Sequence, residues 1–539
     1  MIKHIRWRLF LLASFSFVTS EAQYQFEFLN QADDRLLERQ LHQVQEDRVH
    51  TGSRPLRSED TPNIDSIQAL HAFSGKISKS WWGRKAFNER LVVVETPGFS
   101  WRLDPLVDFS YGYESAAGAN RNLYVNTRGF LMEGRIGKDV SFITTFRENQ
   151  ALLPYWVESF VGQRRVVPGQ GLSRKFQTGV GLDFNQATGV VNYHPSPYFN
   201  FSFGHGQNFF GEGHRSLFLS DNAFSYPYLR IETTVWKIKY VNLYNFMTDI
   251  RPEVEVNNTF ARKYTTMHYL SINLGKRWNI NFFEAIVWSD SALQRGFDVN
   301  FLNPIIFYRP IEFARGSDAS NALLGFGASY LIKDQWMAYG QILLDEFSSR
   351  DIIGGKGSWK NKFAWQLGMK GYDLFGVDNL FGRLEYNAAR PYTYSHLDVI
   401  TNYGHYNQEL AHPWGANFHE IVVQAAYDFK RYGAEFQFNW GIQGNDDNQY
   451  FGRGIYTSYN ERPFDDNHNI GKYNGSRFYF LDLRTYYMIN PAIRLRLELS
   501  YTLRSIRFNE DASSGFSDSD DSVIGFALRT NIFNRYYDF

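Results

Sequence analysis

The sequence predicts an all-β protein: a transmembrane antiparallel β-barrel of about eighteen strands, with lumen-filling loops and a short helical extension before the first strand. The first observation is a series of segments of about ten residues in which apolar and polar side chains alternate. The second is composition, because aromatic residues make up 18% of a chain whose mean hydropathy is only −0.41. The third is that tight turns and long connections separate these segments. No apolar stretch reaches the roughly 18 residues of a spanning helix, so a helical membrane protein is excluded.

Charge and composition exclude several classes of function. The 539 residues carry 56 Lys and Arg against 56 Asp and Glu, so no excess of positive charge is present to neutralise nucleic-acid phosphates. The absence of cysteine excludes a disulfide framework, a thiolate zinc site, an iron–sulfur cluster and a cysteine nucleophile. We expect no nucleic-acid partner, no metal and no cofactor.

The first residues are typical of a secretion signal. Basic residues precede an apolar run at 9–18, and Ser20-Glu21-Ala22 is a small-x-small cleavage sequence. A short membrane anchor is the alternative, but the run has about half of the ~20 residues that a spanning helix needs. We therefore expect residues 1–22 to be a cleaved signal peptide.

The segment 23–99 is predicted to be an N-terminal extension that lies in the periplasm or plugs the barrel. Within it, residues 32–49 place Leu37, Leu41 and Val44 at helical spacing, which predicts a short charged helix. The sequence does not decide between a periplasmic position and one against the barrel.

Residues 100–539 are predicted to form the barrel. The clearest strand is 491–506, where Leu495, Leu497 and Leu499 alternate with polar residues such as Arg496 and Glu498. Such a strand faces lipid on one side and a polar lumen on the other. The predicted strands lie near 103–114, 122–136, 139–148, 175–193, 198–206, 228–235, 237–247, 264–275, 277–288, 322–331, 336–345, 359–371, 380–388, 417–429, 431–440, 477–489, 491–506 and 522–537.

The connections predict the location of the protein. Tight turns such as Val235-Trp236-Lys237 contrast with long connections at 149–174, 207–227, 289–321, 389–416 and 441–476. Short turns on one side and long loops on the other are typical of barrels in the cell outer membrane of Gram-negative bacteria. We expect an integral protein in contact with outer-membrane lipid.

The predicted last strand, 522–537, is followed closely by Phe539. A final amphipathic strand with an aromatic end, here Tyr537 and Phe539, resembles the signal by which bacterial barrels are handed to the barrel-assembly machinery. We expect these two residues to act as the assembly signal.

Three loop motifs resemble a known family. They are 203–222 with Gly204-His205-Gly206, 301–324 with Asn303-Pro304-Ile305-Ile306, and 390–417 with Arg390-Pro391-Tyr392-Thr393-Tyr394. Together they resemble the capsule-assembly Wzi-like family as it occurs in Bacteroidetes, including its RemB-like branch associated with gliding motility. The resemblance covers most of 100–539. It implies an eighteen-stranded outer-membrane barrel, and a role in holding capsular polysaccharide or in gliding.

The third motif combines flat rings with hydrogen-bonding groups, which is the chemistry of a polysaccharide-binding surface. The candidate glycan ligands are Arg390, Tyr392, Tyr394, His396, Tyr403, His405, Tyr406, His412 and Trp414. The alternative is a hydrogen-bonded plug, because a barrel of this size otherwise leaves an aqueous channel.

The other two motifs predict a polar network of lumen loops. Its candidate members are His205, Glu212, His214, Arg215, Asp221, Arg309 and Glu312. We expect Arg215 to pair with Asp221, and Arg309 with Glu312. The glycines of the first motif match no nucleotide-binding fingerprint, and its histidines lack the spacing of a helical zinc site.

The sequence favours binding over catalysis. Ser216 with His214 and Asp221, or Ser395 with His396, offer a nucleophile and a base, but neither pair stands in a recognisable nucleophile motif. We therefore expect no enzyme, but a barrel that binds or anchors surface or capsular polysaccharide and is an accessory of gliding motility. The alternative is an outer-membrane porin or transporter for a solute or oligosaccharide. The oligomeric state stays open.

Overall fold

A computed structural model gives the fold of the chain. It describes residues 29–42, 44, 48–56, 77–116, 119–176, 181–289, 297–305, 320–346, 355–510, 512–530 and 533–539. The predicted signal peptide at 1–22 lies outside the described residues.

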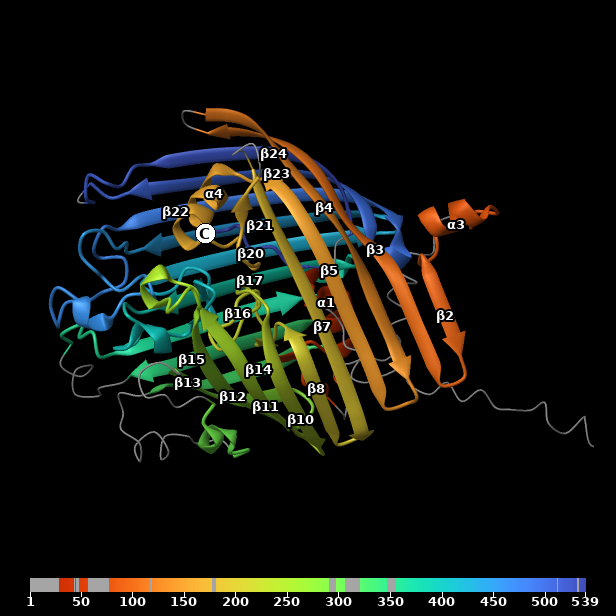
Figure 1. Cartoon of the computed structure of the whole chain (residues 1–539), viewed down its shortest axis with the longest axis horizontal. Helices are drawn as coiled ribbons and strands as arrows, with labels where there is room; N and C mark the ends of the chain where they lie inside the picture. Colours follow the sequence, from red (N-terminus) through yellow and green to blue (C-terminus); the bar gives the residue numbers. More distant parts are fainter. Residues whose placement is uncertain are drawn as a thin grey trace, which may run out of the picture.

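In the described part of the chain, eighteen antiparallel strands close into one barrel (Figure 1). They are β3 (Phe99–Ala116), β4 (Ala119–Ile136), β5 (Val140–Leu152), β7 (Leu182–Ser196), β8 (Phe199–Gly206), β10 (Tyr226–Val235), β11 (Ile238–Asp249), β12 (Ala261–Leu274), β13 (Trp278–Ser289), β14 (Ser320–Lys333), β15 (Trp336–Glu346), β16 (Lys362–Gly371), β17 (Leu380–Ala389), β20 (Phe418–Phe429), β21 (Tyr432–Gln443), β22 (Ser476–Asn490), β23 (Leu495–Phe508) and β24 (Ser519–Thr530). The barrel closes where β24 pairs with β3, from Asp521 opposite Ala116 to Arg529 opposite Asp108. The predicted fold class and strand number are confirmed.

Shorter elements complete the described fold. They are α1 (Gln31–Leu41), β1 (Ser53–Arg54), α3 (Trp81–Phe87), β2 (Val92–Thr96), α4 (Tyr155–Arg164), β6 (Arg174–Lys175), β9 (Phe209–Phe210), η1 (Pro252–Val254), η2 (Val299–Leu302), η4 (Leu374–Gly376), η5 (Val399–Thr401), β18 (Gly404–His405), β19 (Gln408–Glu409), η6 (Tyr459–Glu461) and η7 (Pro491–Ile493). None of the helices in the described ranges has the length and apolar character to cross a membrane.

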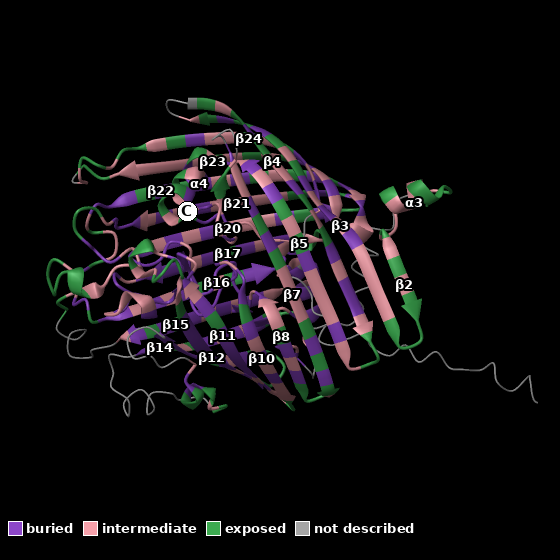
Figure 2. Cartoon of the chain, in the orientation of Figure 1, coloured by how far each residue is buried: buried purple, intermediate pink, exposed green. Residues whose placement is uncertain are grey.

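The wall has one apolar and one polar face, as the alternation predicts. On β23, Leu499 and Tyr501 are 54% and 40% exposed, whereas Arg496 and Glu498 are 2% and 3% exposed. Figure 2 shows the same alternation of buried and exposed positions along β3, β4 and β5. Large apolar side chains on the outside suit lipid, and charged side chains on the inside suit a polar lumen. The closed barrel with this exterior is an integral outer-membrane protein.

The two ends of the barrel differ. Connections at one end are tight turns, such as Gly137–Asp139 and Trp236–Lys237, whereas those at the other end include the long loops 207–225, 390–417 and 444–475. Short turns face the periplasm and long loops face the cell exterior in outer-membrane barrels. We orient the molecule accordingly.

The N-terminal helix lies inside the barrel at its periplasmic end. Leu37 and Leu41 on α1 are 3% and 2% exposed, and the Arg39 guanidinium lies 2.8 Å from the Asp373 carboxylate in a periplasmic turn. The helix ends at Leu41, so the expected helix over 32–49 is too long. These contacts place α1 against the barrel, within the end of the lumen that carries the short turns.

The end of the last strand also differs from the prediction. The expected strand 522–537 is wrong beyond residue 530, because β24 ends at Thr530. Residues 533–539 turn into the lumen, where Tyr536 and Asp538 are 6% and 2% exposed.

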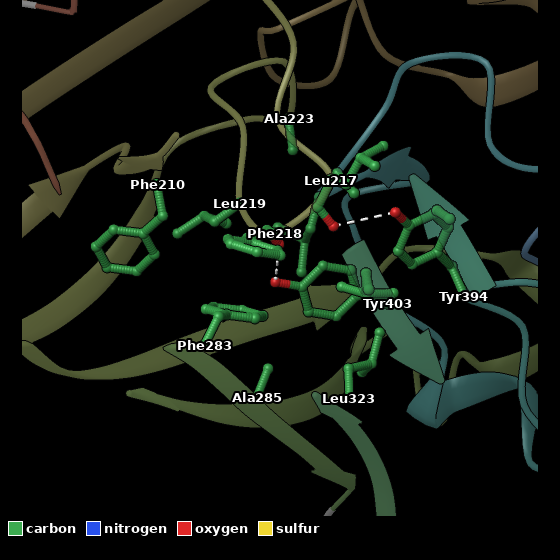
Figure 3. Packing of buried hydrophobic residues seen from close by; sticks show 14 of the residues in the cluster. Phe210, Leu217, Phe218, Leu219, Ala223, Phe283, Ala285, Leu323, Tyr394 and Tyr403 are labelled. Carbon is green, nitrogen blue, oxygen red and sulfur yellow. Dashed lines mark hydrogen bonds between the residues drawn. The ribbon is translucent and has the colours of Figure 1, made fainter. Parts of the chain in front are cut away.

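The largest apolar cluster among the described residues joins inward-facing strand residues of the wall to the loops in the lumen. Phe218 of the loop 207–225 stacks on Phe283 with ring centroids 5.0 Å apart. Tyr394 and Tyr403 donate hydrogen bonds to the carbonyls of Leu217 and Phe218, at 3.0 and 2.6 Å (Figure 3). The loops 207–225 and 390–417 therefore pack against each other as one plug.

Candidate functional site

A buried ionic centre joins the plug to the wall. The Arg215 guanidinium of the loop 207–225 lies 3.1 Å from Glu420 on β20 and 2.7 Å from Asp538 of the C-terminal segment. Glu420 also contacts His412 of the loop 390–417 at 2.7 Å. Although burial alone raises the pKa of Asp538, the opposing charges of Arg215 and His214 lower it to about 2. Four parts of the chain thus meet at one set of charges.

A second ionic centre holds the N-terminal segment. The Lys370 ammonium on β16 lies 3.0 Å from Glu38 on α1 and 3.1 Å from Glu212 of the loop 207–225. Arg54 pairs with Glu38 from the other side, and the Thr51 hydroxyl donates to Glu212 at 2.6 Å. Since these charges are buried, each depends on its partners for stability.

The same centre contains ligand types for a metal. Donor atoms of Glu38, His42 and Glu212 lie within 4.8 Å of one another. Lys370 lies between the two carboxylates, and Arg54 binds Glu38, so the side chains already supply the opposing charge. A metal ion here would have to displace two cationic side chains, and we assign none to this centre.

His42 makes the second ionic centre sensitive to pH. It is 1% exposed, and among the described residues neither ring nitrogen has a hydrogen-bond partner. Burial first, and the positive charge of Lys370 second, hold the pKa of His42 well below 6.5. A detached α1 exposes His42 to water, where it binds a proton near pH 6.5. Because the detached state binds more protons, docking of α1 is strongest above pH 6.5 and weakens as the pH falls below it.

With His42 neutral in the docked state, we expect the detached population of α1 to rise about sixteenfold between pH 6.5 and pH 5. Hydrogen exchange of α1 amides measures this population. The control is His42→Phe at the same pH values, which cancels the intrinsic pH dependence of exchange. Equal pH dependence in both proteins would contradict the assignment.

Most of the predicted glycan ligands are buried in the plug. Those with 2% exposure or less are Tyr392, Tyr394, Tyr403, His405, His412 and Trp414. His396 is 6% exposed, and its ring contacts the Thr401 hydroxyl at 2.7 Å. Half-buried Arg390 donates to the Asn361 and His468 carbonyls, and half-buried Tyr406 packs on Phe224. The burial of these rings favours the hydrogen-bonded plug over direct contact with an external sugar, and a glycan-binding role of these residues stays a prediction.

The predicted polar network is present in part. Glu212, His214 and Arg215 lie in the lumen, but the expected pairing of Arg215 with Asp221 is wrong. Asp221 instead accepts hydrogen bonds from the Tyr536 hydroxyl at 2.7 Å and the Asn534 amide at 2.8 Å. His205 lies on β8, where its ring contacts the Ala187 carbonyl at 3.1 Å. The predicted pair Arg309 and Glu312 lies outside the described residues.

The serine–histidine pairs are not arranged for catalysis. The Ser216 hydroxyl donates to the Phe210 carbonyl, while His214 contacts Gln31 at 2.8 Å. The Ser395 hydroxyl donates to the Tyr392 carbonyl at 2.6 Å. Neither hydroxyl is hydrogen-bonded to its neighbouring imidazole, which nucleophilic catalysis requires.

The residues expected to form the assembly signal contact the helix α4. The Tyr537 carbonyl accepts a hydrogen bond from the Trp156 indole at 2.9 Å, and Phe539 packs on Phe160 of α4 at 4.8 Å. Recognition of Tyr537 and Phe539 by the assembly machinery stays a prediction.

An aromatic and polar surface lies on the outer loops. Its residues, which we call the loop-tip patch, are Tyr459, Arg462, Phe464, Asp466, Asn467 and Tyr473. The Arg462 guanidinium covers the Trp359 ring at 4.0 Å, and the Phe464 ring meets Tyr473 at 5.3 Å. Phe464 is 37% exposed, and Asp466 and Asn467 beside it are exposed. The sequence pattern did not point to this patch, although its residues lie within the long connection 441–476.

A cavity rich in arginine lies beside the plug. It has a volume of about 140 Å³. Its arginines are Arg35, Arg147, Arg383, Arg484, Arg529 and Arg535, and its acidic residues are Glu435 and Asp482. Four of the six guanidinium groups already pair with carboxylates, those of Asp428, Asp482, Glu498 and Asp108, so Arg147 and Arg383 are the groups that suit an anionic solute.

The fold is that of known outer-membrane barrels. No family model and no curated protein matches the chain. One similar solved structure is Wzi from Escherichia coli, an outer membrane protein involved in group 1 capsule assembly and a carbohydrate-binding β-barrel. Its TM-score is 0.54 at 13% sequence identity, and the alignment covers 95% of this chain and 100% of the Wzi chain. OccAB1 from Acinetobacter baumannii has a TM-score of 0.43 and 10% identity, covering 80% of this chain and 97% of its own. OprD from Pseudomonas aeruginosa has a TM-score of 0.41 and 10% identity, covering 81% and 96%. The likeness to Wzi establishes a shared fold.

Proposed function

We propose that the protein is a closed outer-membrane barrel, without enzymatic activity, that binds or anchors surface or capsular polysaccharide at its extracellular loops. The observation that carries the proposal is the filled lumen: two loops and both terminal segments meet there around buried charges. A barrel filled in this way offers its outer surface, not its interior, to a large molecule. The carbohydrate-binding role of the structurally similar Wzi supports the proposal.

The loop-tip patch supplies the chemistry for a sugar chain. The Phe464 ring stacks on His468 with centroids 4.8 Å apart, and its exposed part offers an apolar surface on which the C–H groups of a sugar ring pack. Asp466 and Asn467 lie exposed beside it, and their oxygens accept hydrogen bonds from sugar hydroxyls. We thus propose glycan binding on the long loops, as expected from the sequence, but on different residues.

The resemblance of the loop motifs to the RemB-like branch in Bacteroidetes extends this proposal. An outer-membrane barrel that binds polysaccharide outside the cell links the cell envelope to the polysaccharide-coated surface on which the cell moves. We therefore include an accessory role in gliding motility in the proposed function.

Replacing both Phe464 and Asp466 by Ala is expected to lower polysaccharide binding about tenfold or more, because a stacking face and a hydrogen-bond acceptor are lost. Retention of surface polysaccharide on cells, and binding of the purified polysaccharide to the detergent-solubilised protein, measure the effect. Trp236→Ala, which removes an even more exposed aromatic ring (83% against 37% for Phe464) from a periplasmic turn, is the control. Unchanged retention in the double variant would remove the patch from the proposal.

The arginine-rich cavity supports a second candidate, a porin or transporter for an anionic solute or oligosaccharide. A guanidinium-lined path attracts anions and repels cations. An open, anion-selective conductance of the intact chain in planar bilayers would favour this candidate over the closed barrel.

A further inference from the structure

The large apolar side chains of the short helix α3 are exposed. Trp81, Trp82 and Phe87 are 49%, 78% and 50% exposed, and none of its seven residues is buried. The two indole rings pack only edge to face on each other, with centroids 4.6 Å apart. In Figure 1, α3 stands outside the wall beside β2, at the end where the short turns gather. Such a group of exposed large apolar residues marks an interaction surface.

The helix is held in this position by the barrel. The Asn490 side chain, in the turn between β22 and β23, donates to the carbonyls of Lys85 and Glu89 at 2.9 Å each. After the helix, Arg90 pairs with Asp104 of β3 at 2.6 Å. Ser80 caps the helix by accepting a hydrogen bond from the Gly83 amide at 3.1 Å. The tryptophans are therefore presented by a fixed element.

The surroundings identify the partner of this surface. Other aromatic residues of the periplasmic turns are also exposed, among them Trp236 at 83% and Phe375 at 90%. Aromatic girdles at this level of a barrel lie in the interface between lipid and water. The tryptophans of α3 thus extend the aromatic surface of the periplasmic turns outward from the barrel wall.

The charges of the segment fit the same partner. Lys79 is exposed next to the tryptophans, and Arg84 and Lys85 share the single acidic partner Glu89. Excess basic charge beside exposed tryptophan and phenylalanine is typical of a helix that lies in a membrane interface. Phospholipid phosphates supply the complementary negative charge.

We infer that α3 is an interfacial anchor that binds the phospholipids of the periplasmic leaflet of the outer membrane. Trp81, Trp82 and Phe87 enter the boundary between headgroups and acyl chains, and Lys79 and Arg84 face the phosphates. The anchor thereby attaches to the membrane the part of the chain that lies between the lumen plug and the first barrel strand.

The absence of cysteine in the chain makes a direct test possible. A spin label is attached to Trp82→Cys, and separately to Phe87→Cys, in the full-length protein in nanodiscs of phosphatidylethanolamine and phosphatidylglycerol. Accessibility to oxygen, which concentrates in lipid, is compared with accessibility to a water-soluble nickel chelate. Tyr501→Cys on the lipid face of β23 is the lipid reference, and Asp465→Cys on an outer loop is the water reference.

We expect an oxygen-to-nickel accessibility ratio at both α3 positions at least about threefold above that of the water reference. A ratio equal to that of Asp465→Cys would overturn the inference, because α3 would then lie in the periplasm. Protection from both reagents would also overturn it, because α3 would then pack on protein. Glycan retention does not depend on this result, so the proposed function is tested separately.

Discussion

Arg215→Met is expected to destabilise the plug by about 3–5 kcal/mol, because the change leaves Glu420 and Asp538 buried without their shared cation. Arg215 is 1% exposed, so water cannot replace the guanidinium without opening the plug. The amides of the loop 207–225 should then exchange hydrogen about a hundredfold faster or more, since each 1.4 kcal/mol corresponds to a factor of ten.

The matched control is Arg507→Met on β23. Arg507 also pairs with a carboxylate, Asp520, at 2.6 Å, but the two side chains are 41% and 63% exposed. Exposed pairs of this kind contribute less than about 1 kcal/mol, so this variant should keep the protection of the wild-type loop. Equal protection in Arg215→Met and in the control would show that the buried centre does not hold the plug.

The wall of the barrel was predictable because membrane strands have a simple local rule. Lipid on one side and a polar lumen on the other impose alternation with a period of two, and β23 shows that alternation directly in its sequence. The strand number follows from counting such segments. The same rule fails at the end of β24, since residues 533–537 continue a plausible strand pattern.

The reason for that failure lies in pairing. A strand continued beyond Arg529 would need the edge of β3 on the periplasmic side of Asp108. Part of that edge is occupied, because β2 pairs with β3 from Val92 opposite Leu103 to Thr96 opposite Phe99. The last residues turn into the lumen, where Asp538 and Tyr536 find partners. Only the assembled sheet determines which strand edge is free for pairing, so the local sequence pattern cannot show it.

The site was less predictable than the wall for a related reason. Arg215 finds its partners at positions 205 and 323 residues further along the chain. The alternation shows which strand residues face the lumen, so Glu420 could have been assigned to the lumen. It does not show which charged loop residue pairs with Glu420. The rings of the loop 390–417 pose the same difficulty, because aromatic residues mixed with hydrogen-bonding groups suit a plug as well as a sugar surface.

Deleting residues 29–56 is expected to open the periplasmic mouth of the barrel. This segment includes α1 and is tied to the barrel through Glu38 with Lys370, Arg39 with Asp373 and Arg35 with Asp428. Without it, water reaches Lys370 and Glu212, and the arginine-rich cavity loses part of its wall at Arg35. In planar bilayers, the intact chain should show no steady single-channel conductance, and the truncated chain should show brief or sustained openings that favour anions.

Trp82→Ala is the control for this measurement, because α3 lies outside the wall and its loss of an indole leaves the lumen contacts unchanged. Lys370→Met gives an intermediate case, since Glu38 and Glu212 then share a buried site without the ammonium that separates them. Openings that increase from wild type through Lys370→Met to the truncated chain would show that the N-terminal segment closes the lumen. A truncated chain that stays closed would mean that the loops 207–225 and 390–417 seal the barrel alone. An intact chain that conducts would reverse the order of the two proposed functions, because a continuous path past the arginines is what a transporter needs and what a surface anchor does not.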